Sequence, residues 1–148
     1  MAELFRAQHV WEVAGFLLEE GDTASAPDRW SAILDARCRS AQSRAYYAVF
    51  LRLKERLSAI SRDVLDDKDS VHKALGEGVR GHLGVAHELS DLLKKLWRHR
   101  ARSDYELGAG YSADVAQDRL EDAEDAIALV DGLSPEDLRG IVSAIRSA

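Results

Sequence analysis

The stretch Ser43-Arg44-Ala45-Tyr46-Tyr47-Ala48-Val49-Phe50 carries the most information about the fold. Its apolar residues belong to a spacing of three and four that extends on both sides, which is the period of an amphipathic helix. We therefore expect one long helix over about residues 33–61. Its buried stripe is predicted to consist of Tyr46, Val49, Leu53, Leu57 and Ile60.

Helical periodicity also occurs on both sides of this helix. A broad apolar face over residues 4–19 predicts a first helix, and the small and polar residues of 21–28 predict a loop. Ser70 is a suitable cap for a short third helix, which we expect to fade in the glycines that follow it. Those glycines are Gly76, Gly78, Gly81 and Gly84.

The second half of the chain predicts three more helices. The fourth should run from about Val85 to about Tyr105, before a stop at residues 108–110, which read Gly-Ala-Gly. Ser112 is the expected cap of the fifth helix. Ser134, followed by proline and two acidic residues, is the expected cap of the sixth.

Composition agrees with an all-α protein. The chain is 46% hydrophobic and 31% charged, and no segment alternates as a strand would. Short links between most helices favour an antiparallel bundle of four main helices with one or two short additions, forming a single domain over residues 1–148. No apolar stretch approaches the roughly 20 residues of a membrane-spanning helix, and no signal-peptide pattern occurs. We expect a cytoplasmic protein without membrane contact.

Charge is distributed unevenly along the chain. The formal net charge of −6 argues against a general nucleic-acid binder, because such proteins normally carry a basic excess. Basic residues nevertheless gather in 37–62 and 94–102, and acidic residues in 114–125. Such runs are also typical of solvated helix faces and mutual salt bridges. The lone Cys38 has no neighbours at ligand spacing, so we expect a structural side chain and no metal site.

A second informative stretch, Leu96-Trp97-Arg98-His99-Arg100-Ala101-Arg102-Ser103-Asp104-Tyr105, lies at the end of the predicted fourth helix. Together with residues 43–50, and with His72 between them, it resembles the HEPN superfamily, most closely its small stand-alone prokaryotic branch. That branch shows a helix with S-R-x-Y-Y-A-x-F, a middle histidine and a helix ending in R-x-x-A-D-Y. The resemblance covers about residues 8–132 and implies the helical HEPN bundle.

The resemblance also implies a chemistry. In active HEPN ribonucleases an arginine is followed after four to six residues by a histidine; the histidine moves a proton at a ribose oxygen, and the arginine stabilises charge on the phosphate without a metal. Aligning Arg98 with that arginine places Ser103 at the histidine position and Tyr105 at the motif tyrosine. Aligning Arg100 instead places Tyr105 at the histidine position. The catalytic candidates are therefore Arg98 and, from a shifted position, His99.

The other site residues implied by the resemblance belong to the same two stretches. Tyr47 and Arg44 could face the end of the fourth helix, where a structural hydrogen bond is as reasonable as ligand contact. Asp104 could pair with Arg44 or with Arg100 and fix the two helices together. The candidates for RNA or nucleotide binding are Arg44, Tyr47, Arg100, Arg102, Asp104 and Tyr105.

Three classes of function remain open. The first is a HEPN protein of a prokaryotic conflict system, a toxin-antitoxin or phage-defence module, that binds RNA and, if active, cleaves it without a metal. The second, favoured by the missing histidine, is a non-catalytic module that pairs with a nucleotidyltransferase-like partner or binds a nucleotide. The third is a purely structural helical subunit. The resemblance implies a homodimer, because the family's cleft is built from two protomers, and no cofactor is expected.

Overall fold

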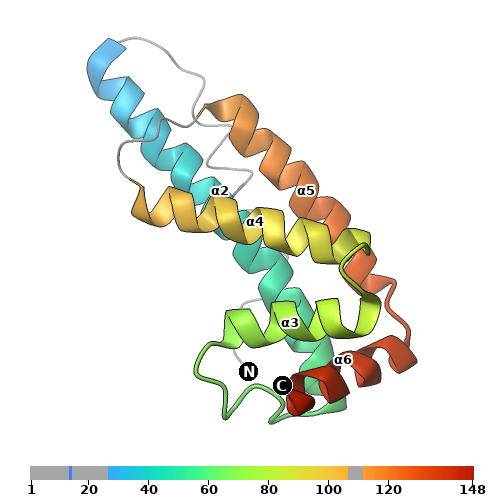
Figure 1. The fold of residues 1–148 in the computed structure, drawn as a ribbon. Helices are drawn as coiled ribbons and strands as arrows, with labels where there is room; N and C mark the ends of the chain where they lie inside the picture. Colours follow the sequence, from blue (N-terminus) through green and yellow to red (C-terminus); the bar gives the residue numbers. More distant parts are fainter. Residues whose placement is uncertain (1–13, 15–26, 107–111) are drawn as a thin grey trace, which may run out of the picture.

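The computed structural model describes Ala14, residues 27–106 and residues 112–148, with side chains described from residue 35 onward in the second range. Every regular element in these ranges is an α-helix, which confirms the all-α prediction (Figure 1). The predicted first helix and the Gly-Ala-Gly stop lie outside the described residues, apart from Ala14, which is helical and fully buried. Within the described ranges, no helix combines the length and apolarity that crossing a membrane requires.

Helix α2, Pro27–Ile60, is the long central element of the fold. It begins at Pro27 and not near Ile33. The loop predicted over residues 21–28 is therefore wrong at residues 27 and 28, which are helical. Proline is tolerated at the first helical position because its missing N–H would have no partner there. The predicted buried stripe is confirmed for every member except Ile60, which is 41% exposed because the helix ends there and the chain turns away.

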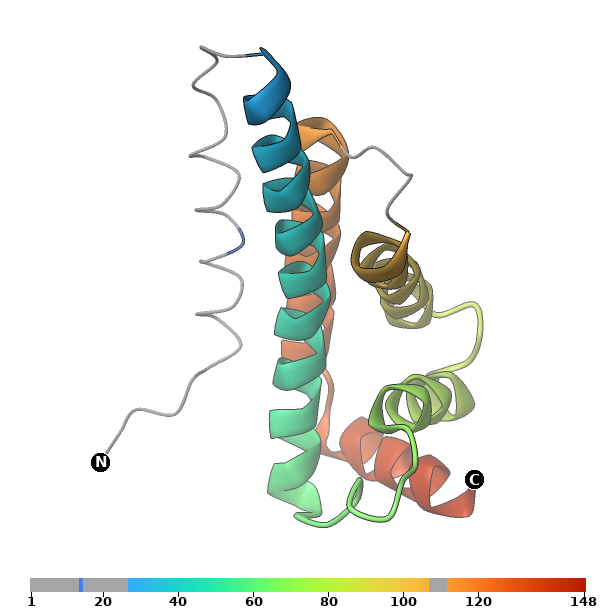
Figure 2. The ribbon, with the colours of Figure 1, turned by 90° about the vertical axis from the view of Figure 1, so that its left-hand side faces the viewer.

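Helices α4 (Glu88–Tyr105) and α5 (Ala113–Asp131) pack against α2. Helix α5 lies alongside α2, whereas α4 crosses it steeply (Figure 2). Helices α2 and α5 run in the same direction. Arg52, late in α2, donates to Asp131 at the end of α5 at 2.6 Å. The antiparallel arrangement expected for neighbouring helices does not hold for this pair, because the intervening α3 and α4 return the chain toward the start of α2.

The two short additions are α3 (Val71–Leu83) and α6 (Pro135–Ser147), which pack against each other. The glycines expected to end α3 lie inside it, apart from Gly84, which has a φ of +97° and follows its last residue. A Cβ atom on Gly78 would lie only 2.3 Å from Cγ1 of Ile145 in α6. The glycine therefore permits close contact between the two helices, which explains why it does not interrupt α3.

The predicted capping serines are confirmed at three helix starts. The side-chain oxygens of Ser70, Ser112 and Ser134 each accept a hydrogen bond from the backbone N–H three residues later, at 3.1–3.3 Å. Helix α4, in contrast, begins later than predicted. His87 caps it, because Nδ1 accepts from the backbone N–H of Leu89 at 3.1 Å, and the predicted first residue, Val85, lies outside the helix.

Candidate functional site

Arg100 connects the two stretches that the sequence analysis singled out. Its Nη2 donates to the Tyr47 hydroxyl at 2.9 Å, and its Nε lies 2.8 Å from an oxygen of Asp104. The guanidinium carbon also lies 5.3 Å from the ring centroid of Tyr47 and 5.9 Å from that of Tyr105. The Arg100 side chain is only 16% exposed. Its charge and donors are thus largely engaged within the protein, and the cluster joins α4 to α2.

Asp104 and Arg44, which were considered as partners for each other, bind different residues. Asp104 pairs with Arg100, and Arg44 instead donates to the Ser40 hydroxyl of its own helix, on the exposed surface. Tyr105, the last residue of α4, is 74% exposed. The structure brings together four of the candidate residues: Tyr47, Arg100, Asp104 and Tyr105. Arg44 is not part of this cluster, because its side chain donates to Ser40.

Arg39 holds the end of α4 in place, a role that the sequence analysis missed. Its Nη1 donates to the backbone carbonyls of Ser103 and Glu106 at 3.1 and 2.8 Å, and its Nε donates to Asp35 at 2.6 Å. The last carbonyls of a helix have no partners within the helix, so such a donor stabilises the end that carries the candidate site. The four-residue spacing of Asp35 and Arg39 was the only local signal.

His99 faces α5 and is held there by charged residues. Nη1 of Arg119 donates to His99 Nε2 at 2.7 Å, and Asp122 forms ion pairs with both Arg119 and Lys95 at 2.9 and 3.0 Å. Burial lowers the pKa of His99 below its usual 6.5, and the nearby cations, led by Arg119, lower it further. The imidazole is therefore neutral near neutral pH, and one nitrogen already accepts a hydrogen bond.

Arg98 and His99 lie on different faces of α4. Successive residues of a helix are turned by about 100°, and here Arg98 lines a groove toward α3 while His99 contacts α5. Ser103, at the position of the family histidine, is only 4% exposed. Within one chain, the structure therefore does not bring the predicted arginine and shifted histidine to one point.

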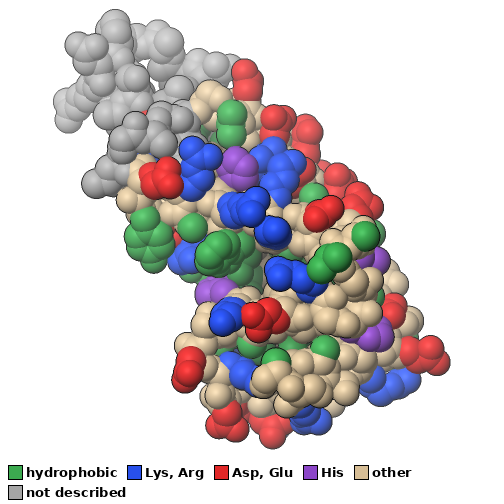
Figure 3. All heavy atoms as spheres, viewed as in Figure 1, with side chains coloured by type: hydrophobic (Ala, Val, Ile, Leu, Met, Phe, Trp, Pro, Cys, Tyr) green, Lys and Arg blue, Asp and Glu red, His purple; other side chains and the backbone are tan. Residues whose placement is uncertain are grey.

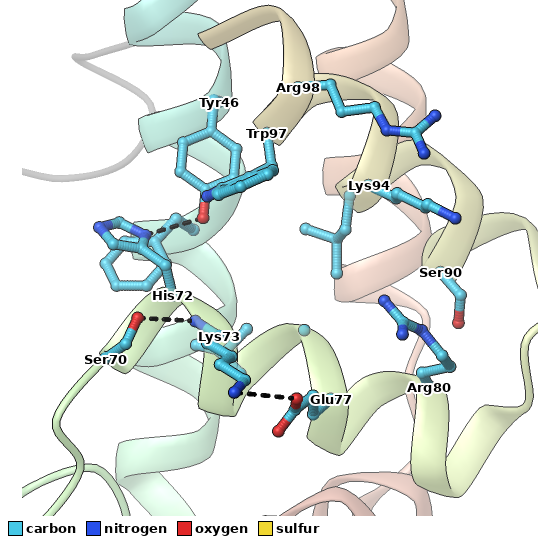
Figure 4. A pocket seen from close by; sticks show the side chains of 14 residues that line it. Tyr46, Ser70, His72, Lys73, Glu77, Arg80, Ser90, Lys94, Trp97 and Arg98 are labelled. Carbon is cyan, nitrogen blue, oxygen red and sulfur yellow. Dashed lines mark hydrogen bonds and ion pairs between the residues drawn. The ribbon is translucent and has the colours of Figure 1, made fainter. Parts of the chain in front are cut away.

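A groove with a volume of about 470 Å³ lies between α3 and α4, with α2 contributing to its lining (Figure 4). At one end a 2.8 Å hydrogen bond joins the Tyr46 hydroxyl to Nδ1 of His72. The ring centroids of His72 and Phe50 are 4.3 Å apart. Burial is the main cause that lowers the pKa of His72, and Arg100 adds to it. The 46% exposed Trp97 completes this aromatic end.

The other end of the groove is basic. Figure 4 shows Arg98, Lys94 and Arg80 extending on the side away from His72 and Tyr46. Among the described residues none of these three side chains has a hydrogen-bond or ion-pair partner, whereas the acidic Glu77 in the lining already faces Lys73 at 3.9 Å. Of the groove residues, the sequence predicted a site role for Arg98 and a buried position for Tyr46. The groove itself could not be predicted, because it depends on how α3 meets α4.

Basic side chains gather along α4 on the face seen in Figure 3, and acidic side chains follow the edge formed by α5. Arg98 and Arg102 are exposed on α4, and the Arg102 side chain pairs with Glu106 at 3.3 Å. This separation of charge agrees with the uneven runs in the sequence. It places a basic surface along α4, although the net charge of the chain is negative.

The fold and this surface define a helical-bundle protein with arginines and a tyrosine grouped at the end of one helix. The family model described as HEPN domain matches residues 32–133, more than half of the chain, and the chain therefore belongs to the HEPN family. The match confirms the resemblance to the HEPN superfamily. It ends within a residue of the expected limit, but it begins later than expected. No curated protein and no solved structure matches the chain.

Proposed function

We propose that this chain is the HEPN component of a prokaryotic conflict system, a toxin-antitoxin or phage-defence module, and that it binds RNA in the cytoplasm. The observation that carries the proposal is the basic surface of α4, where Arg98 and Lys94 have no partner among the described residues (Figure 3). Unpaired cations on one face supply the contacts with phosphates that dominate nucleic-acid affinity. Membership of the HEPN family supports an RNA-related or nucleotide-related role.

Binding without cleavage is the form of this proposal that the geometry favours. Cleavage by the family chemistry needs an imidazole near the phosphate held by arginine. Ser103, which the resemblance places at the histidine position, is buried. His99 accepts a hydrogen bond from Arg119 on a different face of α4 from Arg98. The same observation favours the second candidate function, in which the chain is the non-catalytic partner of a nucleotidyltransferase-like protein.

Fluorescence anisotropy with a short labelled RNA tests the proposal. Arg98→Ala and Arg102→Ala should each weaken binding, because each removes a cation from the α4 surface. His99→Ala should change binding little. Arg139→Ala, which removes an exposed arginine of α6, is the matched control and should bind as the unaltered chain does. Equal affinity in all four variants would reject this surface as the RNA site.

A cleavage assay with the same RNA tests the non-catalytic form. We expect the RNA to stay intact in the presence of EDTA and in its absence. Cutting that persists in EDTA and falls steeply in both Arg98→Ala and His99→Ala would show that the chain is a metal-independent ribonuclease with a shifted histidine. Such a result would overturn the non-catalytic form while leaving RNA binding in place.

A further inference from the structure

The groove between α3 and α4 combines two chemistries in one space. Its volume of about 470 Å³ falls in the range of pockets that hold small molecules, roughly 300–1,000 Å³. One end offers the rings of Trp97, Tyr46 and His72, and the other end offers the side chains of Lys94, Arg98 and Arg80 (Figure 4). A ligand that satisfies both ends has a flat ring and an anionic group.

The aromatic end is open to a ligand, although most aromatic side chains around it are packed. Tyr46 and Phe50 are buried, and the hydrogen bond between Tyr46 and His72 fixes the orientation of the imidazole. Trp97 is different, because almost half of its surface is exposed at the edge of the groove. An exposed tryptophan next to a fixed imidazole is suited to stacking against a planar base.

The basic end is suited to a phosphate. The described residues give Lys94, Arg98 and Arg80 no carboxylate partner, and the acidic Glu77 of the lining already faces Lys73. Three cations without counter-charges repel one another unless an anion lies between them. Arginine forms paired hydrogen bonds to phosphate oxygens, so two arginines and a lysine give a strong preference for that group.

We propose that this groove binds one nucleoside 5′-phosphate, with the base on Trp97 and the phosphate on Lys94, Arg98 and Arg80. The ligand is either a free mononucleotide or the phosphorylated end of an RNA. This inference rests on the proposed function, because both use Arg98 and both concern a ligand with the chemistry of nucleic acid. It adds a site on the α3 side of α4, where Arg80 and Lys94 lie outside the stretches that carry the family resemblance.

Calorimetric titration of the full chain with AMP, GMP, CMP and UMP tests the site. Adenosine and inorganic phosphate, titrated separately, should each bind at least about tenfold more weakly than AMP, because each engages one end of the groove. Trp97→Ala should weaken AMP binding by about tenfold or more through loss of stacking. Trp97→Phe keeps an aromatic ring and should restore most of the affinity.

Charge is tested with a matched pair of arginine variants. Arg80→Ala should weaken AMP binding, because it removes one of the three phosphate-binding groups. Arg139→Ala removes an exposed arginine of α6 that does not line the groove and should leave AMP binding unchanged. Both side chains are exposed, so far-UV circular dichroism should show the same helix content in each variant. AMP binding that is unaffected by both Trp97→Ala and Arg80→Ala would overturn the proposal.

Competition separates the two sources of the ligand and the two proposals. A 5′-phosphorylated RNA that displaces AMP, where its 5′-hydroxyl counterpart does not, supports the RNA end as the occupant; no displacement by either supports a free nucleotide. RNA binding without any mononucleotide binding would overturn the groove site and leave the proposed function intact. Mononucleotide binding without RNA binding would overturn the proposed function and leave the groove site intact.

Discussion

At the scale of single residues, Arg100 is enclosed by side chains from its own helix and from α2, whereas Arg102 two positions later is exposed. Arg100→Ala would leave Asp104 and the Tyr47 hydroxyl without their shared partner, and losing such a partner costs about 1–3 kcal/mol. Arg102→Ala breaks only an exposed pair with Glu106, whose loss costs about 0–1 kcal/mol. Urea unfolding of the two variants measures the difference. Equal destabilisation would contradict the structural role given to Arg100.

The pH dependence of stability is a second prediction at this scale. The pKa values of His99 and His72 are lowered in the folded state, both mainly by burial, so below pH 6.5 the unfolded chain binds protons that the folded chain does not. The free energy of unfolding should therefore fall as the pH drops below about 6.5 and be insensitive to these groups above it.

The variant His99→Gln checks this assignment, because it keeps a side-chain acceptor for Arg119 and cannot titrate. Urea unfolding between about pH 7.5 and about pH 5.5 should show a shallower decline in the variant than in the unaltered chain. Identical declines would show that His99 does not carry the pH dependence.

Which residues make up the site could be predicted only in part. Arg98, Arg100 and Tyr105 could be named as candidates because they stand in one contiguous stretch. Arg39 and Arg119 were missed because their partners in α4, Ser103 and His99, lie 64 and 20 residues away along the chain. Contacts of that kind depend on how the helices pack, which no local pattern gives.

At the scale of elements, the contact between α3 and α6 depends on glycine. Gly78→Ala would place a Cβ atom 2.3 Å from the buried Ile145, so the helices must move apart at a cost of about 1–3 kcal/mol. Gly76→Ala is the control in the same helix, because nothing lies within 4 Å of its Cβ position. There the better helix propensity of alanine should stabilise the chain by up to about 1 kcal/mol. Urea midpoints that move in the same direction for both variants would contradict this packing.

Helix ends followed from the sequence where the signal is local. Ser70, Ser112 and Ser134 bond to N–H groups three residues away, so their patterns were sufficient. The start of α4 was not predictable in this way, because histidine at position 87 is an unusual cap. Gly78 looked like a helix breaker, since its reason for being glycine lies in α6, far along the chain.

At the scale of the whole molecule, we expect a homodimer. The family's cleft is built from two protomers, and a basic surface on each can share the phosphates of one RNA. The acidic edge of α5 should stay outside that cleft, because like charges repel phosphate (Figure 3). Sedimentation velocity at tens of micromolar should show a dimer. A monomer under those conditions, with no partner present, would count against this arrangement.

The central claim is that the α4 surface binds RNA through its arginines, and the salt dependence of binding tests it most directly. The logarithm of the affinity falls with the logarithm of salt concentration, with a slope of about 0.7 per phosphate contact for a single strand. Replacing both Arg98 and Arg102 by alanine should weaken RNA binding and make that slope shallower by about 0.7 per lost contact. Arg139→Ala should leave the slope unchanged. An unchanged slope in the double variant, or an equal change in the Arg139→Ala control, would contradict the account.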